Sequence, residues 1–224
     1  MNIAFIPARC GSKSIPLKNI KLFCGKPLIY WSLFSAQKSS SIDKIYVATD
    51  CLEIKNTVNS FQFSKVEIYD RKPENAGDLS SSDSVILEFI EEKKLNDEIN
   101  FALIQATSPL IQPADIDNCF GNFKIEKCDS LLSCVRIKRF FWSESMQPIN
   151  YNYLNRPRRQ DFKGTLMENG AIYISRVKNI KQSKNRISGR ISIYEMHENT
   201  AIEIDEYEDW QAAESFMKKS FEEN

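Results

Sequence analysis

The sequence lacks three features that would each indicate a broad class of protein. None of its hydrophobic runs approaches the ~20 residues that a membrane-spanning helix needs. Its 30 basic and 30 acidic residues give a net charge of zero, so no overall positive field exists to attract nucleic acid. The apolar stretch at residues 3–8 is short and is followed by charges, which is not the pattern of a secretory signal. We therefore expect a cytoplasmic protein that binds neither a membrane nor nucleic acid.

Paired cysteines and histidine-rich clusters are also missing. The cysteines, at positions 10, 24, 51, 119, 128 and 134, form no C-x-x-C pair, and most lie inside apolar segments. This spacing favours buried free thiols in a reducing cytosol over a zinc site or a disulfide framework. The only histidine, His197, lies at an expected turn between two short strands, which favours a structural role.

What the sequence does contain is an alternation of short apolar runs with longer segments of helical period. This rhythm predicts an α/β protein with three layers, a mostly parallel sheet covered by helices on both faces. Strands are expected at residues 2–8, 44–49, 65–69, 100–105, 130–135, 169–175, 191–196 and 201–204. Helices are expected at residues 27–39, 51–60, 82–94, 113–126 and 207–221.

The rhythm breaks at about residues 138–168. This segment holds R-F-F-W, two prolines, several asparagines and the run R-P-R-R-Q-D. It predicts an excursion from the sheet, because a further strand and helix would show regular hydrophobic spacing. No repeat or low-complexity linker divides the chain, so we predict one domain over residues 1–224 with an inserted arm.

The loop after the first strand is dense in cations. It reads A-R-C-G-S-K-S-I-P-L-K-N, residues 8–19, and includes Arg9, Lys13 and Lys18. Ligands of α/β sheets bind beyond the C-terminal ends of the strands, and backbone N–H groups together with cations suit a polyphosphate. The pattern G-x-x-x-x-G-K of a Walker A loop is absent. The loop therefore predicts a phosphate site of another kind, with a solvated basic turn as the alternative.

Polar groups at the end of the strand over residues 100–105 are expected at the same edge of the sheet. Gln105, Thr107 and Ser108 lie in the run L-I-Q-A-T-S-P-L. They are suitably placed to orient a substrate. The alternative is a strand end followed by a Thr/Ser cap of the next helix.

Two acidic residues near the C-terminus form a candidate metal site. Glu203 and Asp205 are two apart in an extended piece, so both side chains point to one face. Paired carboxylates suit Mg²⁺ that bridges phosphates. The alternative is an acidic first turn of the last helix, which the helix dipole favours.

The segment at residues 156–174 is cationic at its start and abruptly apolar at its end. Arg158 and Arg159 are suited to hold a carboxylate by forked hydrogen bonds. Asn169 and Gly170 admit a simpler interpretation as a tight turn before a strand.

Taken together, these motifs resemble the CMP-sialic acid synthetases, or acylneuraminate cytidylyltransferases. The first loop resembles that family's A-R-G-G-S-K-G-I-P-x-K-N, and residues 105–110 resemble its L-Q-P-T-S-P-L. The segment with R-P-R-R-Q-D and E-N-G-A-I-Y-I is similar to both animal and bacterial members, and the tail is similar to D-I-D-x-x-x-D-W. The matches occur in order over nearly the whole chain.

The resemblance implies a nucleotide-diphospho-sugar transferase fold and a reaction in which CTP and a nine-carbon 2-keto sugar acid give CMP-sugar and pyrophosphate. The anomeric hydroxyl attacks the α-phosphorus in line, and Mg²⁺ (or Mn²⁺) assists. The resemblance also implies a homodimer whose arm lies across the partner subunit. Related acceptors remain open, namely deaminated sialic, legionaminic, pseudaminic and octulosonic acids, as does a non-catalytic nucleotide-sugar binding protein.

By the same resemblance, individual residues take roles. The residues implied in catalysis are Arg9, Lys18 and Asp205. Those implied in nucleotide binding are Arg9, Ser12, Lys18, Asn19, Arg71 and Ser82. Those implied in sugar binding are Gln105, Arg159, Gln160, Asn169 and Tyr173, and those implied in metal binding are Asp205 and Glu203.

Four positions depart from the family pattern. Cys10 and Ser14 stand where the loop usually has glycine, and both add bulk where backbone approaches phosphate. Ile111 stands where many relatives have arginine, and Glu203 replaces the first aspartate of D-I-D. No residue is identified as a general base.

Overall fold

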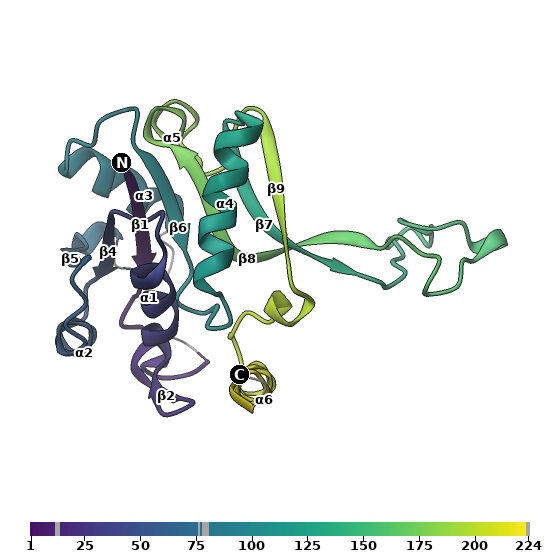
Figure 1. Ribbon diagram of the computed structural model, residues 1–224, viewed down its shortest axis with the longest axis horizontal. Coiled ribbons are helices and arrows are strands. Elements are labelled where there is room, and N and C mark those ends of the chain that lie inside the picture. The colour runs from purple at the N-terminus through teal and green to yellow at the C-terminus, as the bar shows by residue number, and fades with distance from the viewer. Residues whose placement is uncertain (12–13, 76, 78–80, 223–224) are drawn as a thin grey trace.

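A computed structural model describes residues 1–11, 14–75, 77 and 81–222 of the chain (Figure 1). Within these residues, seven strands form one sheet in the order β5-β4-β1-β6-β8-β7-β9. The strands are β1 (Asn2–Pro7), β4 (Lys44–Thr49), β5 (Val66–Asp70), β6 (Asn100–Ile104), β7 (Ser130–Ile137), β8 (Thr165–Arg176) and β9 (Ile191–Met196). Only β8 runs antiparallel to its neighbours, which confirms the prediction of a mostly parallel sheet.

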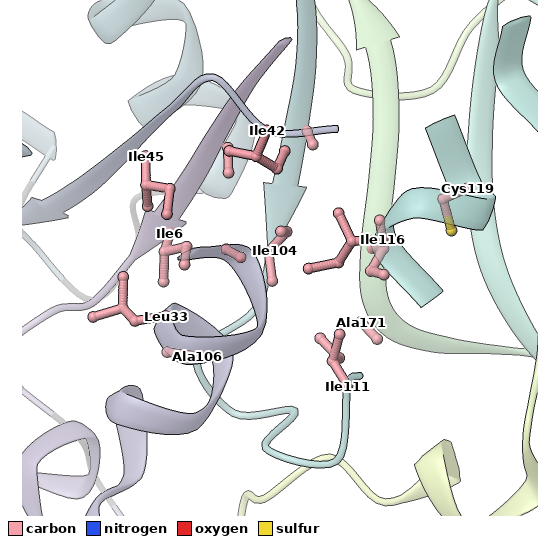
Figure 2. Packing of buried hydrophobic residues seen from close by; sticks show 14 of the residues in the cluster. Ile6, Leu33, Ile42, Ile45, Ile104, Ala106, Ile111, Ile116, Cys119 and Ala171 are labelled. Atoms are coloured by element: carbon pink, nitrogen blue, oxygen red, sulfur yellow. The ribbon is translucent and has the colours of Figure 1, made fainter. Parts of the chain in front are cut away.

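Helices cover both faces of this sheet. One face packs against α1 (Leu28–Lys38), α2 (Leu52–Ser60) and α4 (Pro113–Glu126), and the other packs against α3 (Ser82–Glu92) and α5 (Val177–Ser183). Strand β1 is apolar on both sides, because Ile6 belongs to the first core and Phe5 to the second. Figure 2 shows Ile6 of β1 and Leu33 of α1 packed in the first core. The predicted three layers are confirmed.

A third, smaller core lies beside the sheet. Here α6 (Tyr207–Glu222) packs Trp210 against Phe23 of the two-stranded ribbon β2 (Leu22–Phe23) and β3 (Lys26–Pro27), with the ring centroids 5.5 Å apart. Ile15 and Ile204 are buried in the same core. This packing fixes the end of the first loop and the segment before α6 to one another, and both contribute to the site described below. Among the described residues, no helix combines the length and the apolar composition that crossing a membrane requires.

Three local predictions differ from the structure. The expected strand at 201–204 is absent from the described structure, because residues 198–201 form a short 3-10 turn (η4, Glu198–Ala201) that Nδ1 of His197 caps by accepting from the Asn199 N–H at 3.3 Å. Helix α5 was not predicted. Strand β8 begins four residues before the expected start, since it pairs with β7 from Ile137 opposite Thr165.

Asn169 and Gly170 form a bulge within β8 and not a turn before it. The pairing with β7 shifts between Leu132 and Cys134, and Gly170 has φ +69°. The bulge points the Gly170 backbone toward the segment before α6, where Glu203 lies against it.

The predicted arm extends from the paired ends of β7 and β8 away from the layered body (Figure 1). Its interior is a small aromatic cluster in which the ring of Phe140 lies 4.3 Å from Tyr151 and 4.8 Å from Phe162. Other large side chains of the arm face outward: Trp142 is 51% exposed and Leu154 is 80% exposed. The arm therefore carries apolar surface that this chain alone does not cover.

Candidate active site

A cavity of about 320 Å³ lies at the edge of the sheet where β1 and β6 end. The described residues that line it are Pro7, Arg9, Lys18, Asn19, Arg71, Ser81, Ser82, Val85, Gln105, Ala106, Thr107, Glu203 and Asp205. They come from four separate stretches of the chain. The volume is in the usual range for a small-molecule site, and the lining combines cations, hydroxyls and carboxylates.

Lys18 links the first loop to the acidic segment. It begins the 3-10 turn η1 (Lys18–Ile20), which follows Leu17 in a left-handed conformation with φ 50°. Its Nζ donates to the Ile204 carbonyl at 2.6 Å and to Oδ1 of Asp205 at 3.1 Å. The Ser14 hydroxyl also donates to the Asp205 carbonyl. The loop is thus anchored to residues about 190 positions later in the sequence and keeps Lys18 beside the cavity.

Glu203 and Asp205 occupy the acidic side of the cavity. Oε1 of Glu203 accepts a hydrogen bond from the Thr107 hydroxyl at 3.1 Å. Burial, and then the nearby Asp205 carboxylate, raise the pKa of Glu203 above its ordinary value. Two carboxylates that repel one another beside bound or incoming phosphates form a place where a hard divalent cation is favoured.

Gly170 allows Glu203 to take this position. A Cβ at residue 170 would lie 2.8 Å from Oε2 of Glu203, and φ +69° is itself costly for a residue with a side chain. The absence of a side chain at Gly170 therefore leaves room for the carboxylate of Glu203, which comes from another part of the chain.

Arg71 is a further cation in the lining of the cavity. Its side chain is buried, and Nη2 donates to the Asn75 carbonyl. Burial lowers the pKa of the Arg71 guanidinium from its ordinary value, with Asp50 and Glu88 opposing that effect. Nε of Arg71 is buried and has no hydrogen-bond partner among the described residues. A buried donor without a partner beside a cavity indicates that a ligand acceptor completes it.

Ser82 is the first residue of α3. The Ser81 hydroxyl caps this helix by accepting from the Ser84 N–H at 3.1 Å. Both serines line the cavity, so it receives the N-terminus of a helix as well as side-chain hydroxyls.

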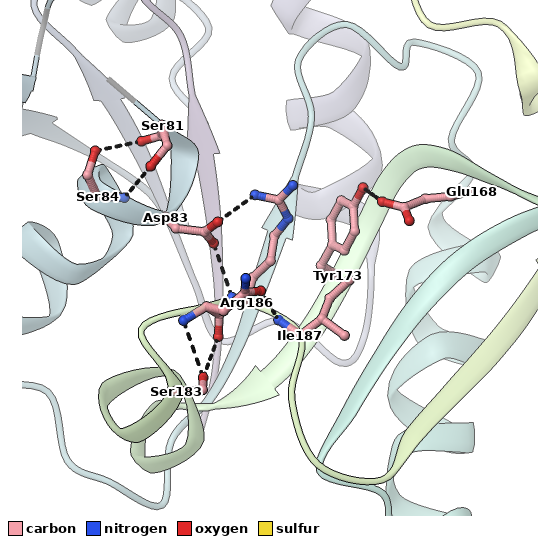
Figure 3. A network of polar contacts seen from close by, with 9 residues as sticks. Ser81, Asp83, Ser84, Glu168, Tyr173, Ser183, Arg186 and Ile187 are labelled. Atoms are coloured by element: carbon pink, nitrogen blue, oxygen red, sulfur yellow. Dashed lines mark hydrogen bonds and ion pairs between the residues drawn. The ribbon is translucent and has the colours of Figure 1, made fainter. Parts of the chain in front are cut away.

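Tyr173 and Asn169, from the predicted sugar-binding set, lie close to the cavity's elements without lining it. The Tyr173 hydroxyl donates to Glu168, and its ring is covered at 4.7 Å by the Arg186 guanidinium, which pairs with Asp83 at 3.2 Å (Figure 3). Asn169 is buried within the bulge, where Oδ1 accepts from Ser133 at 2.7 Å and Nδ2 donates to Thr200 Oγ1 at 3.1 Å.

The other predicted residues divide between three places. Gln105 lines the cavity with Arg9, Lys18 and Asn19, whose Nδ2 donates to the Arg9 carbonyl at 3.2 Å. Arg159 and Gln160 lie in the arm and are exposed, and Arg159 lines a separate hollow with Phe140 and Phe162. Ser12 lies outside the described residues.

Sequence reasoning missed Asp83 and Arg186, which position Tyr173, and it gave no role to Ser81. Arg186 lies in a polar stretch with no distinguishing pattern, so no sequence signal identifies it. Ser81 precedes a helix, and the run S-S-S-D carried a capping signal that was available. Ile111, one of the departures, is buried in the first core.

A comparison with known protein families identifies the family of this chain. The model of the family described as Cytidylyltransferase matches residues 3–223. The chain belongs to this family. The resemblance seen in the motifs is confirmed, and with it the assignment to the nucleotidyltransferases.

Curated relatives are similar along the same length. N-acylneuraminate cytidylyltransferase of Oncorhynchus mykiss is 37% identical over 219 residues, which cover 94% of this chain and 49% of the relative. The enzyme of the same name from Streptococcus agalactiae serotype III is 30% identical over 229 residues, covering 93% of this chain and 51% of the relative. The chain thus spans about half the length of the curated relatives it matches.

Solved structures share the fold. The CMP:2-keto-3-deoxy-manno-octonic acid synthetase complexed with CTP has a TM-score of 0.73 and 18% identity, covering 98% of this chain and 99% of that one. The 4-diphosphocytidyl-2C-methyl-D-erythritol synthase of Anaerococcus prevotii has a TM-score of 0.67 and 11% identity, covering 97% and 96%. At these identities the likeness concerns the fold.

Proposed function

We propose that this cytidylyltransferase transfers CMP from CTP to the anomeric hydroxyl of a nine-carbon 2-keto sugar acid of the N-acetylneuraminate type, releasing pyrophosphate. The observation that carries the proposal is a single cavity whose lining combines the cations Arg9, Lys18 and Arg71 with the carboxylates of Glu203 and Asp205. The names of the curated relatives support the sugar acid as acceptor. The six free cysteines support a cytoplasmic location, where thiols stay reduced.

The cations would hold the nucleotide. Arg9 and Lys18 neutralise the triphosphate from the first loop. Nε of Arg71, with Ser82 at the start of α3, completes its hydrogen bonding with the acceptor groups of CTP. Because these donors are already fixed by Lys18–Ile204, Asn19–Arg9 and Arg71–Asn75 hydrogen bonds, little reorganisation is needed when charge develops.

Asp205 and Glu203 fit a magnesium ion. Both offer carboxylate oxygens to the same cavity, and oxygen ligands of this kind are those that Mg²⁺ prefers. When bound, Mg²⁺ supplies charge neutralisation at the phosphates. The hydrogen bond from Thr107 to Glu203 and the one from Lys18 to Asp205 hold the two carboxylates in place.

The reaction itself is an in-line displacement at the α-phosphorus. The sugar's anomeric oxygen forms the new P–O bond as the bond to pyrophosphate breaks, and Arg9 and Lys18 stabilise the charge that builds on the phosphate oxygens. Among the described lining residues there is no histidine, and His197 lines a different hollow. Catalysis by this chain therefore consists of positioning and electrostatic stabilisation.

The carboxylate of the sugar acid needs a cationic partner, and the arm offers one. Arg159 and Gln160 are exposed and do not line the cavity of their own chain. The outward faces of Trp142, Met146 and Leu154 support burial of the arm against a second copy. We propose a homodimer in which each arm brings Arg159 and Gln160 to the cavity of the partner.

Pyrophosphate release with CTP, Mg²⁺ and N-acetylneuraminate tests the proposal. Activity is expected with wild type, and Arg9→Ala and Asp205→Ala should each lose most of kcat, by roughly 100-fold or more. Glu208→Gln, an exposed acid in the first turn of α6, is the matched control and should stay active. Full activity in both site variants would refute the site.

The preferred acceptor is identified by the same assay with a panel of deaminated sialic, legionaminic, pseudaminic and octulosonic acids. CTP binding without turnover of any of them would indicate a nucleotide-binding protein.

A further inference from the structure

A second cluster of metal-ligating side chains lies between the first loop and the start of α2. The Sγ atoms of Cys10 and Cys51 and a carboxylate oxygen of Glu53 all lie within 4.8 Å of one another. Cys10 belongs to the loop after β1, while Cys51 and Glu53 begin α2 after β4. None of the three lines the cavity that holds Glu203 and Asp205, so the cluster is separate from the proposed magnesium site.

The backbone around the cluster is firmly held. The Cys10 N–H donates to Oδ1 of Asp50 at 3.2 Å, and the Cys51 N–H donates to Oγ1 of Thr49 at 3.1 Å. The Cys51 thiol donates to Oε2 of Glu53 at 3.2 Å. Because β1 and β4 are adjacent parallel strands, the fold itself brings Cys10 and Cys51 together although they are 41 positions apart in the sequence.

We propose that Cys10, Cys51 and Glu53 form a binding site for a thiophilic divalent cation such as Zn²⁺. Two thiolates and a carboxylate supply three ligands of a tetrahedral site and leave one position open. Thiolate sulfur selects soft cations, whereas the oxygen ligands of Glu203 and Asp205 select Mg²⁺. The thiolate site is therefore expected to bind soft cations such as Zn²⁺, and the carboxylate site is expected to bind Mg²⁺.

Both thiols must lose their protons to bind a cation, and a bound cation provides the positive charge that displaces those protons. Proton release on binding is therefore expected from this site.

Bound cation would clamp the first loop to α2. Cys10 follows Arg9, which lines the cavity, so a link from Cys10 to α2 would pull on the backbone next to a residue that the proposed function assigns to the triphosphate. We expect Zn²⁺ to inhibit cytidylyl transfer in the presence of excess Mg²⁺. This last expectation rests on the proposed function, whereas the binding of the cation does not.

Titration of the reduced chain, residues 1–224, with Co²⁺ tests the site directly. One equivalent should give thiolate-to-cobalt charge-transfer absorption, release protons, be displaced by Zn²⁺ and survive excess Mg²⁺. Cys10→Gly, which removes a half-buried side chain packed against the first core, and Glu53→Gln, at an exposed position, should each weaken binding by at least about tenfold. Cys24→Ser is the matched control: Cys24 is a half-buried thiol outside the cluster, and its loss should change nothing.

Three results would overturn the site: no charge-transfer band in wild type, an unchanged band in Cys10→Gly, or conversion of Cys10 and Cys51 to a disulfide without cation uptake. In the activity assay, Zn²⁺ should inhibit wild type at least tenfold more strongly than Cys10→Gly. A cobalt site in a protein without transferase activity would leave the cation site standing and refute only the proposed function.

Discussion

The cavity and the arm present opposite ways of building a site. In the cavity, hydrogen bonds tie Lys18 and Glu203 to other stretches of the same chain, and Arg71 is held by nearby Asn75. The arm is held together by its own aromatic cluster and by hydrogen bonds within the arm, such as the one from the Phe141 N–H to Oδ1 of Asn150, and it exposes Trp142 and Leu154. This difference is the basis of our proposal that one chain provides the nucleotide half of the site and that a second copy completes the sugar half.

The largest expected effect concerns the connection between loop and acidic segment. Lys18→Met keeps the length of the side chain but removes the bonds to Ile204 and Asp205 and one cation facing the triphosphate. We expect kcat to fall by roughly 100-fold or more in the pyrophosphate assay. Lys21→Met, which loses only a cation over the Tyr207 ring, is the control and should keep its activity. Equal activity in the two variants would show that the cavity does not depend on this connection.

Mixing two inactive variants tests whether the arm acts on the partner. Arg159→Ala and Asp205→Ala should each be nearly inactive alone. After exchange of subunits, half of the dimers are mixed and each contains one intact site, so the mixture should recover about a quarter of wild-type activity. Analytical ultracentrifugation checks that dimers form. A mixture no more active than its components would place Arg159 in its own chain's site or in none.

Gly170→Ala tests the support behind the carboxylates. The new Cβ meets Glu203 at 2.8 Å and sits at φ +69°, so we expect the free energy of unfolding to fall by about 1–2 kcal/mol. The Mg²⁺ concentration for half-maximal activity should rise about tenfold, because Glu203 is displaced.

The control for this variant is Gly121→Ala. Gly121 lies in α4 with open space at its Cβ position, and alanine there should stabilise the helix by about 0.5–1 kcal/mol without changing the Mg²⁺ dependence. Denaturant unfolding and the Mg²⁺ titration distinguish the two. An unchanged Mg²⁺ dependence in Gly170→Ala would show that the bulge does not support the metal site.

The smallest expected effect is a gain in stability. Burial and the Asp205 carboxylate raise the pKa of Glu203 in the folded state, so its protonation favours folding at low pH and that contribution is lost as the pH rises through the raised value. Glu203→Gln should therefore raise Tm at neutral pH by no more than about 2 °C, because solvent screens the partly exposed side chain, while lowering activity. The gain should shrink as the pH falls and wild-type Glu203 becomes protonated. A loss of Tm at neutral pH would contradict a destabilising interaction between ionised Glu203 and Asp205.

Much of the fold could be predicted because it depends on local pattern. The helix at residues 113–126 and the strands at 44–49 and 191–196 have the bounds that the periodicity predicts. The prediction of a strand at 201–204 is wrong. A pattern of four residues does not show whether a neighbouring strand is available to pair with them. Helix α5 is too short for its periodicity to stand out.

The sequence by itself determined the layered fold, the family and the two charged sets, since hydrophobic period, strand ends and motif order are all local properties of the chain. Only the tertiary structure decided which residues meet. It placed Lys18 on Asp205, Glu203 against Gly170 and Cys10 beside Cys51, and it separated Arg159 from the cavity. These contacts join residues far apart in the chain, and their distances follow from strand order, bulge and helix packing, which no local pattern records.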